Sequence, residues 1–371
     1  MHRTPDPDED DLNTIPSPQP EFYIEQALLG ALLLEPQQLD NVTGIDPDAF
    51  STAAHTALFD AIRSLPAPDP AQHAKNTTWL NTVLTTACKQ TRGLTASYLH
   101  GLIQVCPWPR HAPAYARMIE AEHARRLLRA AAQRLAQTAR DTSLAHPAPT
   151  TLAEADALAA VVGDIAAKFP QHSIPLPRTP SPPATALDDE EAVDEERLLL
   201  ATATAHPGDI EQMRWLAPDD FTRPLHSGLW QCLTALARRH SPVDPVTVLW
   251  EAQHRGLLAS GAQPTELLDL LGAPVGSPEH WAERILQRSL LATAHHVGRR
   301  IEAFTDDPTT TPYQLVVGSR RALADLSAAR TRWHHATSPT LTTRPTATKA
   351  TKPPRAGPPR TTAPPITRLS R

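Results

Sequence analysis

Histidine is the residue type in this sequence with the clearest potential for metal chemistry. The chain has 371 residues and 17 histidines, among them the adjacent pairs His295-His296 and His334-His335. Neighbouring residues on a helix point about 100° apart, and no His-Glu-x-x-His spacing occurs. Two histidines of such a pair therefore do not converge on one ion, and we expect no metal site.

The three cysteines also argue against a metal centre. Cys88, Cys106 and Cys232 lie far apart, without a Cys-x-x-Cys spacing. This pattern predicts neither a zinc site nor a disulfide framework, and it favours a reduced, cytoplasmic protein. No stretch approaches the ~18 apolar residues of a membrane span, and the first residues lack the apolar core of a secretion signal.

No arrangement of side chains indicates catalysis. No Ser/His/Asp or Cys/His spacing singles out a nucleophile. Paired carboxylates occur, but in charge runs such as Asp188 to Glu191, which are usually solvated. We expect no catalytic residues, no cofactor and no enzyme activity.

The elements that would position these residues are predicted to be helices. A helix begins near Ile24 and is closed by Pro36, because proline disfavours helical backbone in the residue before it. A longer helix is expected over 115–140, with one face marked by Leu128, Ala131, Ala132, Leu135 and Ala139. Its arginines lie largely off that face, where they meet either another subunit or solvent: Arg117, Arg125, Arg126, Arg129 and Arg134.

A partner helix is expected over 151–169, with Thr151 as a candidate N-cap and Glu154 three residues later. The short connection contains Pro147 and Pro149, so the two helices are predicted to form an antiparallel hairpin. Alternation typical of strands is nearly absent, and the expected fold class is all-α.

Composition divides the rest of the chain. Proline accounts for 39 of the 371 residues, about twice its usual share. Residues 1–20, about 170–187 and 336–371 read as linkers or disordered tails. The last of these segments carries seven basic residues and no acid, so the remaining residues sum to −12 against −5 for the whole chain.

An internal repeat organises the helical part. Residues 25–62 align without a gap on residues 196–233, at an offset of 171, with nine identities in 38 positions where composition alone gives about three. The correspondence continues to a second hairpin whose last helix runs from Pro312 to about Trp333. We expect the two copies to pack on each other pseudosymmetrically, through apolar faces of the hairpins or heads.

Several identical pairs in the repeat are aromatic or ionisable. His55 and His226 each lie five residues after a phenylalanine, at the start of a predicted helix, where packing or hydrogen bonding to exposed backbone amides is the ordinary role. Phe50 and Phe221 are predicted core anchors. Asp48 and Asp219 are candidate caps of the short segments that carry them.

Several motifs carry a family resemblance. The run from Glu25 to Pro36, EQALLGALLLEP, followed by Asp48-Ala49-Phe50 and by Tyr115-Ala116-Arg117-Met118-Ile119, resembles the N-terminal domain of DnaB-type replicative helicases. In the second copy the run from Pro242 to Thr247, PVDPVT, and Arg255-Gly256-Leu257-Leu258 look like the same domain. The resemblance implies a compact helical head followed by a hairpin, a domain that pairs with itself and receives the primase.

The family's motor is not found. Its RecA-like ATPase needs Gly-Lys-Ser or Gly-Lys-Thr to hold nucleotide phosphates. The chain has five lysines, none after a glycine and none before Ser or Thr: Lys75, Lys89, Lys168, Lys349 and Lys352. We expect this chain alone neither to hydrolyse ATP nor to unwind DNA.

The predicted organisation has five parts: an acidic tail (1–20), a first domain (21–169), a Pro-rich acidic linker (170–189), a second domain (190–333) and a basic Pro/Thr-rich tail (334–371). Cations of the last tail are candidate contacts to nucleic acid, although the tail could equally fold back on the acidic body or keep the protein soluble. The residues concerned are Arg344, Lys349, Lys352, Arg355 and Arg360.

Two classes of function remain. The first is a non-catalytic interaction or assembly module of the replication machinery, with the replicative helicase or primase as partner and self-association between repeats or chains. The second is a DNA-associated protein that uses the tail, with the repeats as scaffold. The N-terminal part of a split helicase is a further possibility. No membrane partner is expected.

Overall fold

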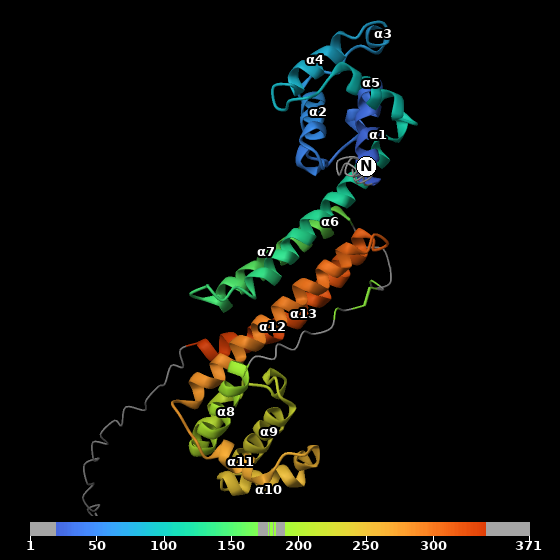
Figure 1. Cartoon of the computed structure of the whole chain (residues 1–371). Coiled ribbons are helices and arrows are strands. Elements are labelled where there is room, and N and C mark those ends of the chain that lie inside the picture. The colour runs from blue at the N-terminus through green and yellow to red at the C-terminus, as the bar shows by residue number, and fades with distance from the viewer. Residues whose placement is uncertain (1–19, 170–176, 178, 181, 183–189, 339–371) are drawn as a thin grey trace, which may run out of the picture. The chain divides into compact units, whose positions relative to one another are not determined.

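A computed structural model of the chain describes residues 20–169, 177, 179, 180, 182 and 190–338. Every regular element within these residues is a helix (Figure 1), which confirms the predicted all-α class. Each repeat consists of a head of short helices followed by two long helices.

Head 1 is built around α1, an apolar helix that the head's other helices surround. Its core contains Leu28, Leu32 and Phe59, all fully buried. Threonines cap two of the short helices: the hydroxyl of Thr52 accepts from the amide of His55, and that of Thr95 accepts from the amide of Tyr98. The elements are α1 (Pro20–Leu34), η2 (Pro36–Asn41), η3 (Pro47–Ala49), α2 (Ala53–Ser64), α3 (Pro70–His73), α4 (Thr78–Ala87), α5 (Ala96–Val105) and η4 (Pro109–His111).

Hairpin 1 follows as α6 (Ala112–Thr138) and α7 (Pro147–Lys168), close to the predicted pair of helices. The expected N-cap at Thr151 is wrong, because α7 begins one turn earlier at Pro147. Pro147 and Pro149 fall in the first turn of the helix, where proline is well tolerated. Thr151 is instead buried inside the helix.

Repeat 2 has the same order of parts. Phe221 and Trp230 lie in the core of head 2, as Phe50 and Phe59 do in head 1, which confirms both predicted phenylalanine anchors. The elements of head 2 are α8 (Glu190–Ala205), η5 (Pro207–Met213), η6 (Pro218–Asp220), α9 (Pro224–Arg238), α10 (Pro245–His254), η7 (Leu257–Ser260) and α11 (Pro264–Leu271); hairpin 2 consists of α12 (Pro278–Asp306) and α13 (Pro312–Thr337).

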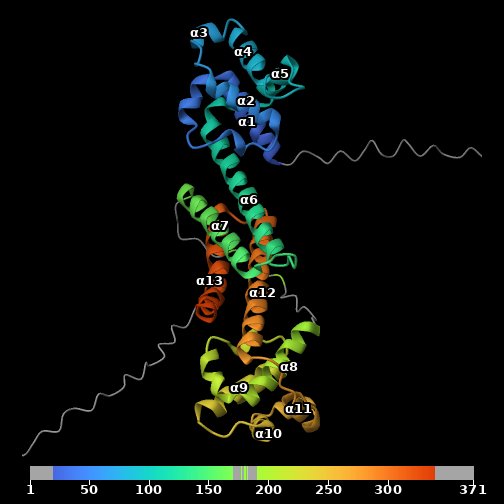
Figure 2. The same cartoon turned by 90° about the vertical axis from the view of Figure 1, so that its left-hand side faces the viewer.

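The two hairpins share one hydrophobic core. Buried residues of all four long helices form a single cluster, with Leu128 and Leu158 from hairpin 1 beside Leu290 and Leu326 from hairpin 2. Figure 2 shows α6, α7, α12 and α13 lying next to one another. The expectation that the repeats pack together through the apolar faces of their hairpins is therefore confirmed.

Candidate interaction surfaces

The tightest contact between the repeats is at the crossing of α6 and α12. Gly298 lies so close to α6 that a Cβ atom there would be 2.7 Å from the carbonyl oxygen of Ala132 and 2.9 Å from Cβ of Ala136. Counting from the aligned pairs Tyr115/Trp281 and Arg134/Arg300, the counterpart of Gly298 in repeat 1 is Ala132 itself. The same position of each copy therefore meets at the crossing, as expected near a pseudo-twofold axis.

Arginines of α6 hold the loop that joins α12 to α13. Nη1 of Arg125 donates to the carbonyl oxygens of Thr305 at 3.0 Å and of Asp307 at 2.9 Å, and Nη2 donates to that of Thr310 at 2.6 Å. Arg129 forms an ion pair with Asp306. These arginines therefore meet the other repeat of the same chain and not another subunit, while the side chain of Arg129 also stays 48 % exposed to solvent.

The other end of the crossing uses different chemistry. His295 occupies in repeat 2 the position of Arg129 in repeat 1, and its Nδ1 lies 3.1 Å from the carbonyl oxygen of Ala136. Burial lowers the pKa of His295 from the ordinary 6.5, and the positive charges of Arg140 and Arg299 lower it further, against the hydrogen bond to Ala136. A neutral imidazole is therefore suited to this position, because an arginine, as in repeat 1, would place a second positive charge next to Arg140.

Part of the segment between the repeats also contacts this region. The hydroxyl of Thr179 donates to Oδ2 of Asp307 at 2.9 Å. Hydrogen bonds, first from Thr309 and then from Thr179, lower the pKa of Asp307 to about 2. Asp307 is therefore a shared acceptor for the loop and the linker.

A buried carboxylate organises head 1. Glu25 on α1 is 1 % exposed. Its carboxylate accepts from the backbone amide of Ser51 at 2.7 Å and from the Ser51 hydroxyl at 2.9 Å, and it lies 2.6 Å from Nδ1 of His55. An ionised carboxylate only accepts, so Nδ1 carries the hydrogen. The other ring nitrogen of His55 lies 2.7 Å from the hydroxyl of Tyr98, whose pKa burial raises.

The same arrangement recurs in head 2. Glu196 accepts from the amide of Thr222 at 2.5 Å and from its hydroxyl at 2.8 Å, and lies 2.6 Å from Nδ1 of His226. Both histidines are buried, as the packing alternative predicts. Their hydrogen-bond partner is a glutamate 30 residues away and not the exposed backbone amides. The signal was present in the sequence, since Glu25 and Glu196 are identical in the alignment and each lies 30 residues before its histidine.

The predicted aspartate caps are wrong. The residues before the short helices η3 and η6 are Asp46 and Ala217, while Asp48 and Asp219 lie inside them. In head 2 the neighbouring Asp220 does the capping, since its Oδ2 accepts from the amide of Ala217 at 2.7 Å.

Asp220 also ties head 2 to its hairpin. Its Oδ1 accepts from the hydroxyl of Ser289 on α12 at 2.6 Å, and Oδ2 forms an ion pair with Arg332 on α13. The counterpart in repeat 1 is Ala49, whose carbonyl oxygen accepts from Arg126 at 2.5 Å. Each head is thus linked to a hairpin helix, through a side chain in one repeat and through backbone in the other.

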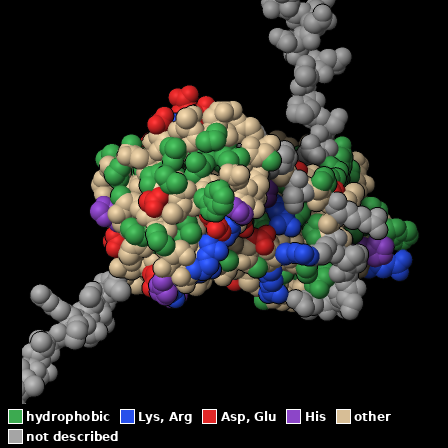
Figure 3. All heavy atoms as spheres, turned by 90° about the horizontal axis from the view of Figure 1, so that it is seen from below, with side chains coloured by type: hydrophobic (Ala, Val, Ile, Leu, Met, Phe, Trp, Pro, Cys, Tyr) green, Lys and Arg blue, Asp and Glu red, His purple; other side chains and the backbone are tan. Residues whose placement is uncertain are grey.

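Large apolar side chains remain on the outside of both heads. In head 1 they follow α1, the end of α5 and the start of α6. In head 2 they lie on α10 and before α12, and Figure 3 shows hydrophobic side chains gathered on the end of the molecule that carries α10 and α11. The most exposed of these residues are Tyr23, Val105, Trp108 and Met118 in head 1, and Val246, Trp250 and Val275 in head 2.

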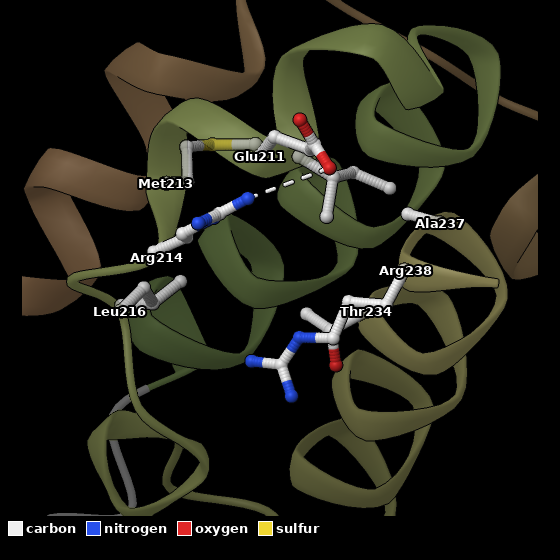
Figure 4. Close-up of a pocket in the computed structure, with 8 residues that line it drawn as sticks. Glu211, Met213, Arg214, Leu216, Thr234, Ala237 and Arg238 are labelled. Carbon is white, nitrogen blue, oxygen red and sulfur yellow. Dashed lines mark ion pairs between the residues drawn. The ribbon is translucent and has the colours of Figure 1, made fainter. Parts of the chain in front are cut away.

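The cavities of the described residues differ in size. A pocket between η5 and α9 in head 2, lined by Met213, Thr234 and Arg238 with an ion pair between Arg214 and Glu211 (Figure 4), holds about 30 Å³. This is room for about one water molecule.

A larger cleft of about 330 Å³ in repeat 1 lies between the loop after η2 and the two hairpin helices. It is lined by Thr43, Arg117, Glu120 and Lys168, and burial raises the pKa of Glu120. Its volume is at the lower end of the range for small-molecule sites.

Within the described residues no group of three or more His, Cys, Asp or Glu side chains is placed to hold a metal ion, and no helix is long and apolar enough to cross a membrane. The candidate tail contacts lie outside the described residues: Arg344, Lys349, Lys352, Arg355 and Arg360.

Comparison with known families gives one result. The model of the DnaB-like helicase N terminal domain matches twice, at residues 17–121 and 188–286, which together are more than half of the chain. No ATPase domain was matched. Searches of curated proteins and of solved structures gave no match.

Proposed function

Because the chain belongs to the DnaB-like helicase N-terminal domain family, we propose that it is a non-catalytic interaction module of the DNA-replication machinery. In this proposal one chain presents two helicase-type N-terminal domains as a preassembled pair. The proposed partners are the replicative helicase, the primase or both, in the cytoplasm.

The shared core of the two hairpins is the observation that carries this proposal. Four long helices bury their apolar faces together, and Arg125 and Arg129 of one repeat bind the loop of the other. Covalent linkage of two such units replaces an encounter between chains by an intramolecular one, which raises their effective concentration. The pair would therefore form at any protein concentration, and its outer surfaces would be left for partners.

The test is a pull-down with the full-length tagged chain from extract of its native cell, followed by binding of the purified partner. Recovery of the helicase or primase, and direct binding measured by light scattering, would support the proposal. Recovery of neither protein, together with no binding between purified components, would remove it. A stimulated ATPase in a co-purified chain would instead favour the N-terminal part of a split helicase.

A second candidate function rests on the tail. Seven cations without an acid over residues 336–371 fit weak phosphate contacts that depend strongly on salt. Its test is a chain that ends at residue 335. Loss of DNA binding with partner binding intact would favour this function, and the reverse result would favour the first.

A further inference from the structure

The cleft between the loop after η2 and hairpin 1 brings three charged side chains together. Arg117 and Glu120 on α6 and Lys168 at the end of α7 line it, around a volume of about 330 Å³. None of the three forms an ion pair or a side-chain hydrogen bond with any residue that the structure describes. The other arginines off the apolar face of α6 all contact a carboxylate or a carbonyl oxygen: Arg125, Arg126, Arg129 and Arg134. The charged groups of the cleft are therefore not used by the fold.

Glu120 lies against the loop that closes the cleft. Gly44 in this loop has a φ of 85°, and a Cβ atom there would be 3.0 Å from Oε1 of Glu120. Burial raises the pKa of Glu120, whereas the positive charges of Lys168 and Arg117 lower it. The two cations are therefore close enough to act on the carboxyl group, although neither contacts it.

The corresponding positions of repeat 2 serve packing. Gly44 corresponds to Trp215, which packs on the core of head 2, and Glu120 corresponds to Leu286, which is fully buried in that core. Repeat 2 thus has two apolar side chains where repeat 1 has a glycine and a carboxylate.

The cation at the end of the last helix is bound in repeat 2. Buried residues of α7 match buried residues of α13 at an offset of 164: Leu158, Val162 and Ile165 correspond to Ala322, Leu326 and Ala329. This register places Lys168 at the position of Arg332, which forms an ion pair with Asp220. Since Ala49 stands at the position of Asp220 in repeat 1, Lys168 lacks that partner.

We propose that this cleft binds a small molecule that carries both an oxyanion and a hydrogen-bond donor. The guanidinium of Arg117 and the ammonium of Lys168 hold the carboxylate or phosphate oxygens, as these groups do in charge-assisted pairs. The carboxylate of Glu120 accepts from a hydroxyl or ammonium group of the same molecule. The volume is at the lower end of the range for small-molecule sites, so the ligand has the size of an amino acid or a sugar phosphate.

The charge around the cleft is mixed, which argues against a bare anion. Asp46 is paired with Arg63 at 3.6 Å, and Arg126 donates to a backbone carbonyl oxygen. Burial lowers the pKa of His123. Carboxylates that adjoin the lining residues in sequence or act on Glu120 or His123 are Asp40, Asp46, Asp48 and Asp164. A ligand with a donor as well as an oxyanion suits such surroundings better than an anion alone.

Isothermal titration calorimetry of the full chain tests the proposal with two pairs of probes. Glycerol 3-phosphate and L-serine carry an oxyanion together with a donor, whereas inorganic phosphate and acetate carry the oxyanion alone. We expect the better of the two donor-bearing probes to bind at one site per chain, about tenfold tighter than its donor-free counterpart. The identity of that probe separates a phosphate ligand from a carboxylate ligand.

Three variants assign the binding to the cleft. Arg117→Glu takes the residue of repeat 2, where Glu283 occupies the corresponding position, and should weaken binding by about tenfold or more, as should Lys168→Ala. Glu120→Leu, which again takes the residue of repeat 2, should remove the preference for the probe with a donor. Lys89→Ala removes an exposed cation of head 1 outside the cleft. It is the matched control and should bind as the unmodified protein does.

The proposal is overturned if no probe binds at one site up to about 10 mM, if binding is unchanged in Arg117→Glu or Lys168→Ala, or if Glu120→Leu keeps the preference. Circular dichroism checks that each variant folds, and Arg117→Gln replaces Arg117→Glu if helicity is lost. The experiment involves no partner protein, so its failure leaves the helicase or primase interaction to be judged separately.

Discussion

Replacing Gly298 by alanine tests whether α6 and α12 cross as closely as the structure shows. The added methyl group would lie 2.7 Å from the carbonyl oxygen of Ala132 and 2.9 Å from both Cβ and the amide nitrogen of Ala136. Two of these three atoms belong to the α6 backbone, so a change of rotamer cannot relieve the overlap. One helix has to move away from the other.

The magnitude follows from two opposing effects. Glycine in a helix interior costs about 1 kcal/mol relative to alanine, so the substitution gains about that amount. Overpacking in a well-packed core costs about 1 to 3 kcal/mol, and contact with backbone argues for the upper part of that range. We expect Gly298→Ala to lower the free energy of unfolding by about 1 to 2 kcal/mol.

Gly163→Ala is the matched control. Gly163 lies inside α7 of the same four helices, and a Cβ atom there would have no neighbour within 4 Å. This variant should gain about 0.5 to 1 kcal/mol from helix propensity alone. Urea unfolding followed by circular dichroism measures both variants. If Gly298→Ala stabilised the chain as much as Gly163→Ala does, the close crossing would be refuted.

Three further predictions concern polar groups that are buried or partly buried. Glu25→Ala and Glu196→Ala should each lower the free energy of unfolding by about 3 kcal/mol, because each leaves a backbone amide and a buried imidazole without their acceptor. Hydrogen exchange should show the loss in the head that carries the change. Arg125→Ala should cost about 2 kcal/mol and speed amide exchange in residues 305–311, since three carbonyl oxygens lose their donor. His295→Gln should flatten the pH dependence of unfolding as the pH falls below the ordinary histidine pKa of 6.5, measured as the urea midpoint.

The sign of the last effect follows from the lowered pKa of His295. The unfolded chain takes up this proton at a higher pH than the folded chain does. The contribution of the residue is therefore complete above the unfolded pKa and is lost as the pH falls through the folded one. A steeper slope in His295→Gln than in the unmodified protein would contradict this reasoning. Arg110→Ala, which removes an exposed cation stacked on Trp108, serves as the control for Arg125→Ala and should leave residues 305–311 unchanged.

Local periodicity was sufficient to predict the long helices, because apolar residues recur at helical spacing along one face over many turns. The start of α7 was missed because Pro147 and Pro149 suit both a loop and a first helical turn, and only tertiary packing decides between them. Likewise, the sequence places Arg125 and Arg129 outside the apolar face of their helix, which indicates that they lie outside the core of their own hairpin. It does not show that the loop of another repeat lies within reach.

Long-range polar pairing was the least predictable feature. His55 and Glu25 are 30 residues apart, and no local rule joins them. The repeat contained the missing information, since the pair recurs as His226 and Glu196 at the same spacing. By contrast, the contacts of Asp220 with Ser289 and Arg332 do not recur in repeat 1, because Ala49 occupies the corresponding position. They can be recognised only in the structure.

The two ends of the α6–α12 crossing show what fusing the two copies into one chain permits. In a homodimer every substitution at a two-fold interface appears twice, so a change that suits one end is imposed on the other. Here the ends have diverged independently: Arg129 pairs with Asp306 at one end, while His295, its counterpart, lies against the backbone of Ala136 at the other. A duplicated gene thus escapes the requirement of self-complementarity, and each half is free to specialise for a neighbour that the other half never meets.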